Sequence, residues 1–343
     1  IYSKKGNHLE AIKALEKALT ITEDLADIYS LLGMEYLFID EIEKAKQSFI
    51  LCLENDDEDQ STLYNIIYCF DFLNENEAAI TYLNSFIDKN PYSEIAWHQL
   101  GRQYYAQKNY DKAVWAFSYA TLIDEQFLGA YLEKGKSLEK LQQYQEAIDN
   151  YMITLELDAP SSYVLLRIGI CYEALNNFPL AIQYYKKTVH EDPMLDKGWI
   201  ALTDIYIKEN QFDKALVTLQ KAINIDELNE RYWIRYAVLN RNLLQFKEAE
   251  VGYRKATELG EYILDYWMDW ADILYLLEEY ESAIDKLLQI EETHPHAVEI
   301  YYRLAVYYFA TYQNEEALAW LAKGFTADFD KVSIIETLFP AQW

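Results

Sequence analysis

The residue types that most often bind metals or move protons are histidine and the carboxylates. The chain has five histidines, and only His294 and His296 lie close together, separated by Pro295. No third metal ligand accompanies this pair, so we interpret it as part of a polar turn between repeats. We predict no metal site in the chain. The remaining histidines are isolated: His8, His98 and His190.

An acidic run over residues 55–59 has the carboxylates of a calcium loop, but it lacks the central glycine and the final glutamate. We interpret the run as a solvated turn that caps the next helix. The sequence also has no glycine-rich phosphate loop and no Gly-x-Ser-x-Gly nucleophile motif. We therefore predict no catalytic residues and no cofactor, and we do not expect an enzyme.

Composition narrows the classes of partner. The chain carries 57 acidic and 30 basic residues, which gives a formal net charge of −27. We expect neither nucleic acid nor an anionic membrane surface as a partner, because both are bound through clustered lysine and arginine. No apolar run reaches the ~18 residues needed for membrane insertion. The three cysteines are too few for a disulfide framework, and we interpret them as reduced packing residues.

One alanine recurs every 34 residues and reveals the organisation of the chain. The series runs Ala11, Ala45, Ala79, Ala113, Ala147, Ala181, Ala215, Ala249, Ala283 and Ala317. A constant period of this length indicates a solenoid, in which each repeated unit packs on its neighbours. We number each unit from 1 to 34 so that this alanine is position 20. Complete units then begin at Ala26, Gln60, Glu94, Leu128, Ser162, Asp196, Glu230, Leu264 and Val298.

Within each unit the apolar residues recur at intervals of three and four, which predicts two amphipathic helices. In the unit 94–127 we expect these helices over 94–107 and 111–124. Position 8 is small in most units, and large rings often occupy positions 4, 11 and 24, so that helix pairs can interdigitate. Positions 15 and 16 are often polar or glycine, which predicts a short break between the helices. The predicted fold class is all-α.

The fullest copy of the pattern reads Trp97-x2-Leu100-Gly101-x2-Tyr104, followed by Ala113-x3-Phe117. It resembles the tetratricopeptide repeat (TPR), and the resemblance covers essentially the whole chain. The resemblance implies a right-handed α-solenoid, a superhelix whose first helices line a concave groove. It also implies a scaffold that holds a partner segment in that groove. We expect one solenoid over 1–343, with a partial repeat 1–25, nine full repeats 26–331 and a C-terminal partial or capping helix 332–343.

Several residues depart from the pattern. Ile67 and Phe86 replace small residues in the unit 60–93, which predicts looser or re-spaced packing there. Asn240 replaces an aromatic residue and needs a hydrogen-bond partner if it is buried. Lys134 replaces an apolar residue. The chain starts at Ile1, inside a repeat and without methionine, so we expect missing sequence upstream.

The resemblance implies that positions 2, 5, 9, 12 and 13 of each unit face the groove. In the middle of the chain, basic residues outnumber acidic ones at these positions. Two interpretations stay open: the lysines and arginines offset neighbouring carboxylates, or they form a stripe that receives acidic groups of a partner. The candidate groove residues are Tyr68, His98, Arg102, Tyr105, Lys136, Lys140, Lys197, Lys208, Arg231, Arg235, Arg241, Tyr275 and Tyr302.

Two known groove patterns of TPR proteins are incomplete here. Arg231 and Arg235 have the spacing of the last basic pair of the carboxylate clamp found in chaperone-binding members. The units before them lack the matching lysine and asparagine, so chaperone-tail binding is not expected. The asparagine ladder of some glycosyltransferase repeats is absent as well.

We therefore expect a non-enzymatic scaffold for a protein or peptide partner, with the basic residues selecting acidic groups. A second hypothesis makes the chain a regulatory or substrate-recruiting arm of a larger enzyme or assembly. A third is self-association through an exposed apolar end face, which the sequence allows but does not indicate. We place the chain in the cytoplasm by default.

Overall fold

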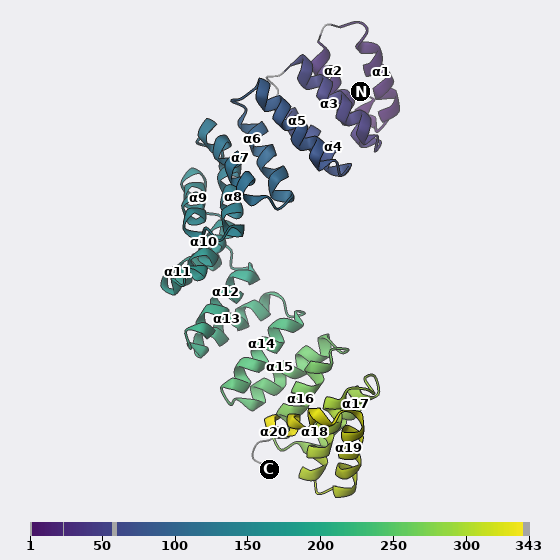
Figure 1. Ribbon diagram of the computed structural model, residues 1–343, viewed down its shortest axis with the longest axis vertical. Coiled ribbons are helices and arrows are strands. Elements are labelled where there is room, and N and C mark those ends of the chain that lie inside the picture. The colour runs from purple at the N-terminus through teal and green to yellow at the C-terminus, as the bar shows by residue number, and fades with distance from the viewer. Residues whose placement is uncertain (1, 23, 57–59, 339–343) are drawn as a thin grey trace. The chain divides into compact units, whose positions relative to one another are not determined.

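The computed structural model describes residues 2–22, 24–56 and 60–338. These residues form helices and turns only, without a strand. The chain divides into two compact units, residues 1–187 and 188–343. Figure 1 labels the helices in chain order. The all-α class predicted from the 34-residue period is confirmed.

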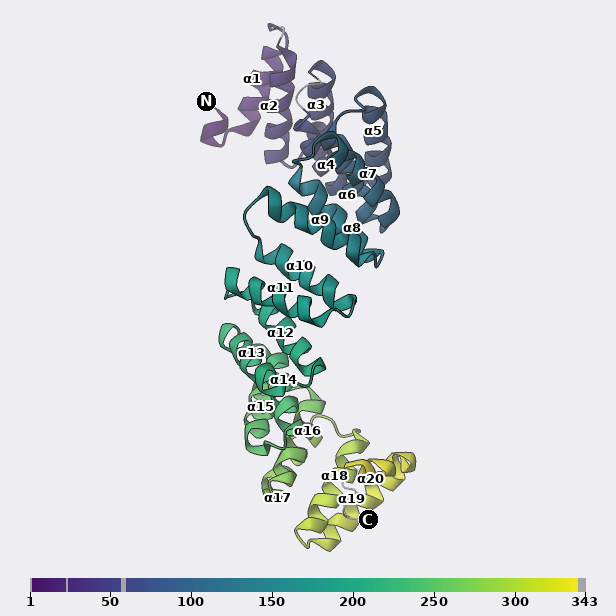
Figure 2. The same ribbon diagram turned by 90° about the vertical axis from the view of Figure 1, so that its left-hand side faces the viewer.

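The N-terminal unit is built from consecutive helix pairs, which can be followed in Figure 2 from purple to teal. A short 3-10 turn, η1, covers Ser3–Lys5 and precedes the first helix. The helices of this unit are α1 (His8–Ala18), α2 (Leu25–Phe38), α3 (Ile42–Asn55), α4 (Thr62–Phe72), α5 (Asn76–Lys89), α6 (Glu94–Ala106), α7 (Tyr110–Ile123), α8 (Leu128–Lys140), α9 (Tyr144–Leu157), α10 (Ser162–Ala174) and most of α11 (Phe178–Glu191).

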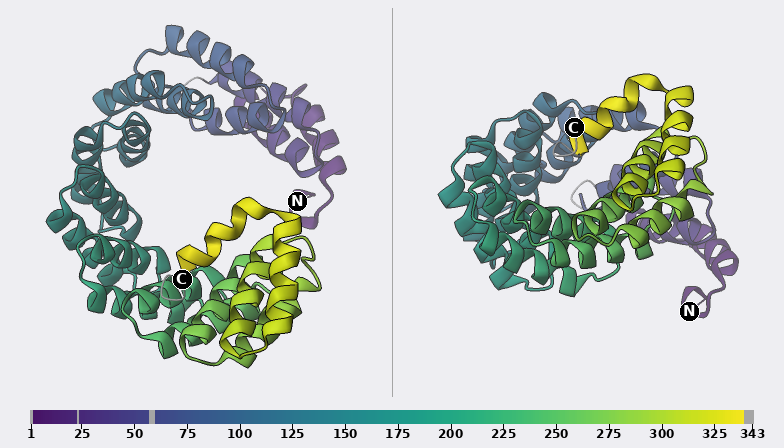
Figure 3. Two further views of the ribbon diagram at one scale, coloured as in Figure 1. Left: turned by 60° about the horizontal axis from the view of Figure 1, so that its bottom comes forward. Right: turned by 90° about the horizontal axis from the view of Figure 1, so that it is seen from below.

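The C-terminal unit continues the same alternation, shown in green and yellow in Figure 3. A short 3-10 turn, η2 (Phe329–Val332), leads into its last helix. The helices are α12 (Asp196–Lys208), α13 (Phe212–Ile225), α14 (Glu230–Asn242), α15 (Phe246–Leu259), α16 (Leu264–Leu276), α17 (Tyr280–Glu291), α18 (Val298–Ala310), α19 (Asn314–Ala327) and α20 (Ser333–Leu338). No described helix is long and apolar enough to cross a membrane.

The break inside each helix pair is a left-handed turn at position 15. Backbone φ at this position lies between 56° and 63° in nine successive units, and Gly6 adopts 73° at the equivalent place in the partial repeat. In the unit 94–127, Asn109 N–H then donates to the Tyr104 carbonyl, which closes a Schellman-type C-cap. The predicted break at positions 15 and 16 is confirmed. Its nine residues are Asp40, Asn74, Lys108, Gln142, Asn176, Asn210, Leu244, Glu278 and Tyr312.

Large rings pack against small residues inside each pair, as the sequence predicts. A methyl group added to Gly101 would lie 2.6 Å from the Phe117 ring, and one added to Gly169 would lie 2.4 Å from the Tyr185 ring. Because such distances are far below van der Waals contact, a larger residue at Gly101 or Gly169 would push the two helices of its pair apart. Phe117 and Tyr185 are fully buried.

The ring at position 4 also holds the loop that precedes it. The indole N–H of Trp97 donates to the Pro91 carbonyl at 3.0 Å, and that of Trp199 donates to the Pro193 carbonyl at 2.9 Å. Trp233 and Trp267 make the same bond to Glu227 and Glu261, and the Tyr301 hydroxyl donates to Pro295. Position 4 was interpreted from the sequence as packing alone, so the structure adds an anchoring role for its polar atom.

The structure shows how two residues that depart from the repeat pattern, Asn240 and Lys134, are accommodated. Asn240 is buried, and its side-chain amide donates to the Tyr236 carbonyl at 2.8 Å. Lys134 is half-buried, and burial lowers the pKa of its ammonium group. Val332 and Ile335 pack on the apolar core of the C-terminal unit. The rest of the expected capping segment, Phe339 and Pro340, lies outside the described residues.

Candidate functional site

The first helices of the N-terminal unit line two neighbouring hollows. The first, which we call the apolar hollow, has a volume of about 400 Å³ and lies over α2 and α4. Phe38, Tyr68 and Phe72 leave 60%, 53% and 56% of their surfaces exposed there, although aromatic rings are usually covered. The lining residues are Met34, Leu37, Phe38, Asp40, Ile42, Asn65, Tyr68 and Phe72.

The second, the polar hollow, has a volume of about 590 Å³ and draws on α4, α6, α8 and α10, with Asn76 from the start of α5. It adjoins the apolar hollow, because Asp71 and Phe72 are consecutive residues of α4 and line one hollow each. The lining residues are Asp71, Asn76, Arg102, Gln103, Tyr105, Ala106, Glu133, Lys136 and Tyr163. Three of the predicted groove residues therefore come together here: Arg102, Tyr105 and Lys136.

Most polar groups of the polar hollow are already engaged. The Gln103 amide donates to Asp71 at 2.9 Å. Lys136 lies 3.8 Å from the Glu133 carboxylate and 5.5 Å from the centre of the Tyr163 ring. Arg102 differs, because its side chain is exposed and reaches only the Gln99 amide oxygen, at 3.4 Å. Among the described residues Arg102 makes no ion pair, so its guanidinium is the cation available to an acidic group.

Three of the six other predicted basic residues lie beside carboxylates. Arg235 lies 2.5 Å from Asp204, and Arg241 lies 3.5 Å from Asp269. Arg231 is highly exposed and lies 3.7 Å from the adjacent Glu230. Lys140, Lys197 and Lys208 are exposed. The pairs formed by Arg231, Arg235 and Arg241 favour the first interpretation of the basic residues, in which they offset carboxylates.

An ion pair that the sequence analysis did not single out links two successive helix pairs of the N-terminal unit. Arg167 on α10 donates to both carboxylate oxygens of Glu139 on α8. The buried Tyr151 hydroxyl donates to the same carboxylate at 2.5 Å. The sequence signal for this pair was an arginine at position 6, the position that Arg235 occupies in its own unit.

Three candidate groove residues need correction, because the structure places their side chains in the interior. His98 is packed between the rings of Phe117 and Phe127, with ring centres 5.6 and 4.8 Å away. Tyr275 stacks on the Tyr307 ring at 4.7 Å. Tyr302 is fully buried, and its hydroxyl donates to the Asp328 carbonyl at 2.6 Å. Packing from neighbouring rings and from the chain after α19 covers these positions.

The environment of His98 is unusual. Neither ring nitrogen has a hydrogen-bond partner within the described chain. Burial, with a smaller contribution from the positive charge of Arg102, lowers the pKa of the imidazole to about 4. His98 is therefore neutral at physiological pH and contributes a packed ring to the core.

No group of three potential metal ligands occurs in the part of the chain that the structure describes. The Nδ1 atom of His294 lies 2.9 Å from the Thr293 hydroxyl, and His296 is exposed in the turn between α17 and α18. The acidic run 55–59 falls largely on residues 57–59, which lie outside the described residues.

Comparison with known families agrees with this architecture. Models of the tetratricopeptide repeat match residues 1–25, 26–59, 61–93 and 268–327. The matches that begin at residues 26 and 61 start within one residue of the unit boundaries expected from the alanine period. The chain is a tetratricopeptide repeat protein.

A second family model matches within this TPR chain. Residues 137–247 match the family of ChAPs, described as Chs5p-Arf1p-binding proteins. No curated protein sequence matches the chain as a relative.

Solved TPR structures are similar in fold and distant in sequence. The C-terminal part of a TPR protein from Cytophaga hutchinsonii matches 77% of this chain and 95% of its own, with a TM-score of 0.51 and 13% identity. A TPR protein from Parabacteroides merdae matches 68% of this chain and 93% of its own, with a TM-score of 0.49 and 13% identity. At this identity the first match supports the fold alone.

Proposed function

We propose that this TPR protein is a non-enzymatic scaffold that holds a segment of a partner protein against the first helices of its N-terminal unit. The observation that carries the proposal is the adjacency of the apolar and polar hollows along α4. An aliphatic or aromatic side chain of the partner fills the apolar hollow. An acidic side chain one or two turns away reaches Arg102.

The exposed rings supply most of the affinity in this proposal. Phe38, Tyr68 and Phe72 each leave about half of their surface in solvent, and covering them releases free energy at about 25 cal/mol per Å². Arg102 adds selectivity, because its guanidinium can bind a carboxylate through two hydrogen bonds. The predicted role of Arg231, Arg235 and Lys197 is secondary, since Arg231 and Arg235 already lie beside carboxylates.

Selection of a random peptide library on the purified chain tests this proposal. Recovered peptides should combine an aliphatic or aromatic residue with a nearby aspartate or glutamate. Phe72→Ser should weaken their binding at least tenfold, and Arg102→Glu should weaken acidic peptides selectively. Leu122→Ser is a matched control. Leu122 is also a large apolar residue and is 75% exposed, but it lies on α7, a second helix that does not line the two hollows. Peptides that bind both variants as tightly as the wild type would contradict the proposal.

The family match over residues 137–247 supports a second candidate, binding of a protein like Chs5p or Arf1p. Purified Chs5p and Arf1p, each tested against the chain by calorimetry, distinguish this candidate from the first. Saturable binding of either would support it, and absence of binding of both would exclude it. A regulatory arm of a larger enzyme remains a third candidate, which the full-length reading frame would decide. The cytoplasmic location stays a prediction.

A further inference from the structure

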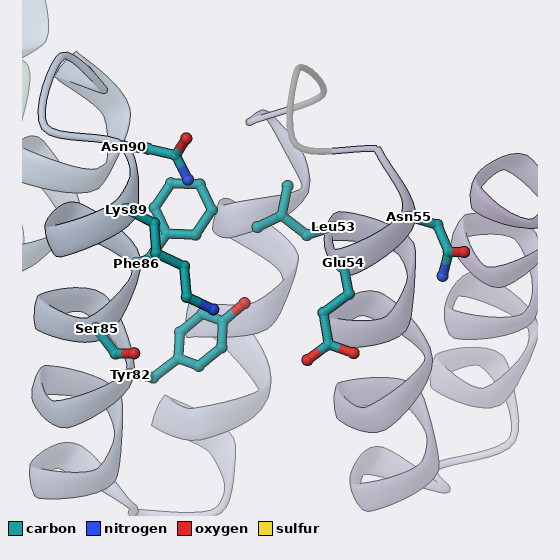
Figure 4. Close-up of a pocket in the computed structure, with 8 residues that line it drawn as sticks. All are labelled: Leu53, Glu54, Asn55, Tyr82, Ser85, Phe86, Lys89 and Asn90. Carbon is teal, nitrogen blue, oxygen red and sulfur yellow. The ribbon is translucent and has the colours of Figure 1, made fainter.

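A cleft opens between α3 and α5, two second helices of the N-terminal unit, away from the hollows described above. Its volume is about 390 Å³, and Figure 4 shows the side chains around it. Leu53 and Phe86, which are 3% and 8% exposed, form its apolar part. The full lining is Leu53, Glu54, Asn55, Tyr82, Ser85, Phe86, Lys89 and Asn90.

The cleft lies where the sequence departs from the repeat. Phe86 occupies position 27, which is small in most other units. Phe86 therefore brings a large ring to a position that most other units fill with a small side chain, and this ring forms part of the cleft wall. The residues at position 27 elsewhere include Cys52, Ala120, Thr154, Thr188, Ala222, Ala256 and Gly324.

Two opposite charges face this cleft from opposite walls. Glu54 belongs to α3 and Lys89 to α5, and Figure 4 shows their side chains extending into the space between the two helices. Neither side chain forms an ion pair within the described chain, although the molecule contains ion pairs between other helices, such as Lys323–Glu291 between α19 and α17. The Tyr82 hydroxyl between them makes no hydrogen bond to a described residue. Burial, together with the negative charge of Glu54, raises the pKa of Tyr82 to about 12, so the hydroxyl stays protonated.

These features specify a ligand class. Both charged residues are exposed, so water solvates them in the free chain. A cation would replace that water only at Glu54, and an anion only at Lys89. A neutral apolar molecule would leave both charges facing an apolar occupant, which is unfavourable. A zwitterion satisfies both charges at once, and its apolar part can lie on Leu53 and Phe86. Specific ligand pockets commonly have volumes of roughly 300 to 1,000 Å³, so the cleft is large enough for a ligand of this size.

We propose that the cleft binds a free α-amino acid with an aliphatic or aromatic side chain. Its ammonium group pairs with Glu54, its carboxylate pairs with Lys89, and the Tyr82 hydroxyl donates to the carboxylate. The site lies on second helices, so it is separate from the face proposed to hold a partner segment.

Calorimetric titration of the intact chain with L-leucine, L-methionine and L-phenylalanine tests the proposal. At least one of them should bind saturably. N-acetyl-L-leucine lacks the ammonium group and L-leucinamide lacks the carboxylate, so both should bind at least tenfold more weakly than L-leucine. Glu54→Gln and Lys89→Met should each weaken amino-acid binding at least tenfold.

A matched control separates the site from a general charge effect. Glu156→Gln changes the residue at the same repeat position as Glu54, also exposed, in a unit that is followed by the small Thr188. This variant should bind amino acids as the wild type does, and circular dichroism should show equal helicity for all variants. Absence of binding by all three amino acids up to about 10 mM overturns the proposal. Equal binding of N-acetyl-L-leucine, or equal binding by both the Glu54 and the Lys89 variants, overturns it as well.

The outcome is independent of the scaffold proposal. Phe72→Ser should leave amino-acid binding unchanged, and Lys89→Met should leave peptide binding unchanged. Failure of one site therefore leaves the other measurable.

Discussion

Arg303 binds Asp272 through two parallel hydrogen bonds, from Nε to Oδ1 at 2.9 Å and from Nη2 to Oδ2 at 3.1 Å. The two residues lie on successive first helices, α18 and α16, and both side chains are largely buried. The Tyr307 hydroxyl donates to the same carboxylate at 2.5 Å. One aspartate thus satisfies a buried cation and a buried phenol.

Asp272→Asn should therefore destabilise the C-terminal unit by about 3 kcal/mol, because it leaves the Arg303 charge buried without its partner. Urea unfolding followed by circular dichroism measures the change. Glu10→Gln is the control, since the Lys13–Glu10 pair has a similar 2.8 Å contact but is exposed. That control should leave the free energy of unfolding close to the wild-type value, because solvent screens an exposed pair. Similar losses in the two variants would contradict the role assigned to burial.

Two tyrosines at position 24 should respond in opposite ways to loss of their hydroxyl. Tyr151 donates to Glu139, whereas the buried Tyr253 hydroxyl has no partner within the described residues. Tyr151→Phe should lower the free energy of unfolding by about 1 to 2 kcal/mol, because it removes a hydrogen bond to a charged group. Tyr253→Phe should leave the stability equal or raise it. Thermal unfolding of both variants measures these changes. A clear loss of stability in Tyr253→Phe would show that the Tyr253 hydroxyl does have a hydrogen-bond partner.

Leu244 occupies a left-handed turn with φ of 59°, and 74% of its surface is exposed. A side chain with a Cβ atom is strained in this region, while glycine is not. Leu244→Gly should therefore raise stability by about 0.5 to 1 kcal/mol, measured by the urea midpoint. Leu244→Ala removes the same exposed side chain but keeps the strained Cβ, so it should give no gain. A gain in the alanine variant would assign the effect to the side chain instead of the backbone.

His98 should make the N-terminal unit sensitive to acid. Its pKa is lowered from 6.5 to about 4 in the folded chain, so between these values the unfolded chain binds a proton that the folded chain excludes. The stability associated with neutral His98 is complete at pH 7 and is lost as the pH falls, reaching about 2 kcal/mol of loss at pH 5. Urea midpoints of the wild type and His98→Phe, compared at pH 7 and pH 5, isolate this loss.

The phenylalanine variant retains every other titrating group, so it should lose less stability than the wild type over the same interval. Parallel losses in both proteins would show that His98 does not titrate as its environment implies. Arg102, on the same helix, is the charged group that adds to the effect of burial.

The sequence predicted the helices well, because their pattern is local and repeats many times. The helices expected over 94–107 and 111–124 form as Glu94–Ala106 and Tyr110–Ile123. The break at position 15 was also predictable, although Leu244 and Tyr312 are unusual residues for a left-handed turn.

The candidate groove was predicted less well, because it depends on contacts between units. Arg235 and Asp204 are 31 residues apart in the sequence, and only the stacking of α14 on α12 brings them within 2.5 Å. Tyr302 follows the pattern of an exposed position, yet the chain after α19 covers it. The position of a residue in an idealised repeat therefore predicts the helix face on which it lies. It does not predict whether neighbouring segments cover that side chain or leave it exposed to solvent.

The bond from the position 4 ring to the preceding loop has a practical consequence for dissecting this molecule. In five places, a connecting segment is secured by the helix pair that follows it. A shortened version that started at Asp196 would keep Trp199 but discard the Pro193 carbonyl to which its indole is bound. Starting at Pro193 preserves the bond, so the natural module boundary for protein engineering lies three residues before the helix begins.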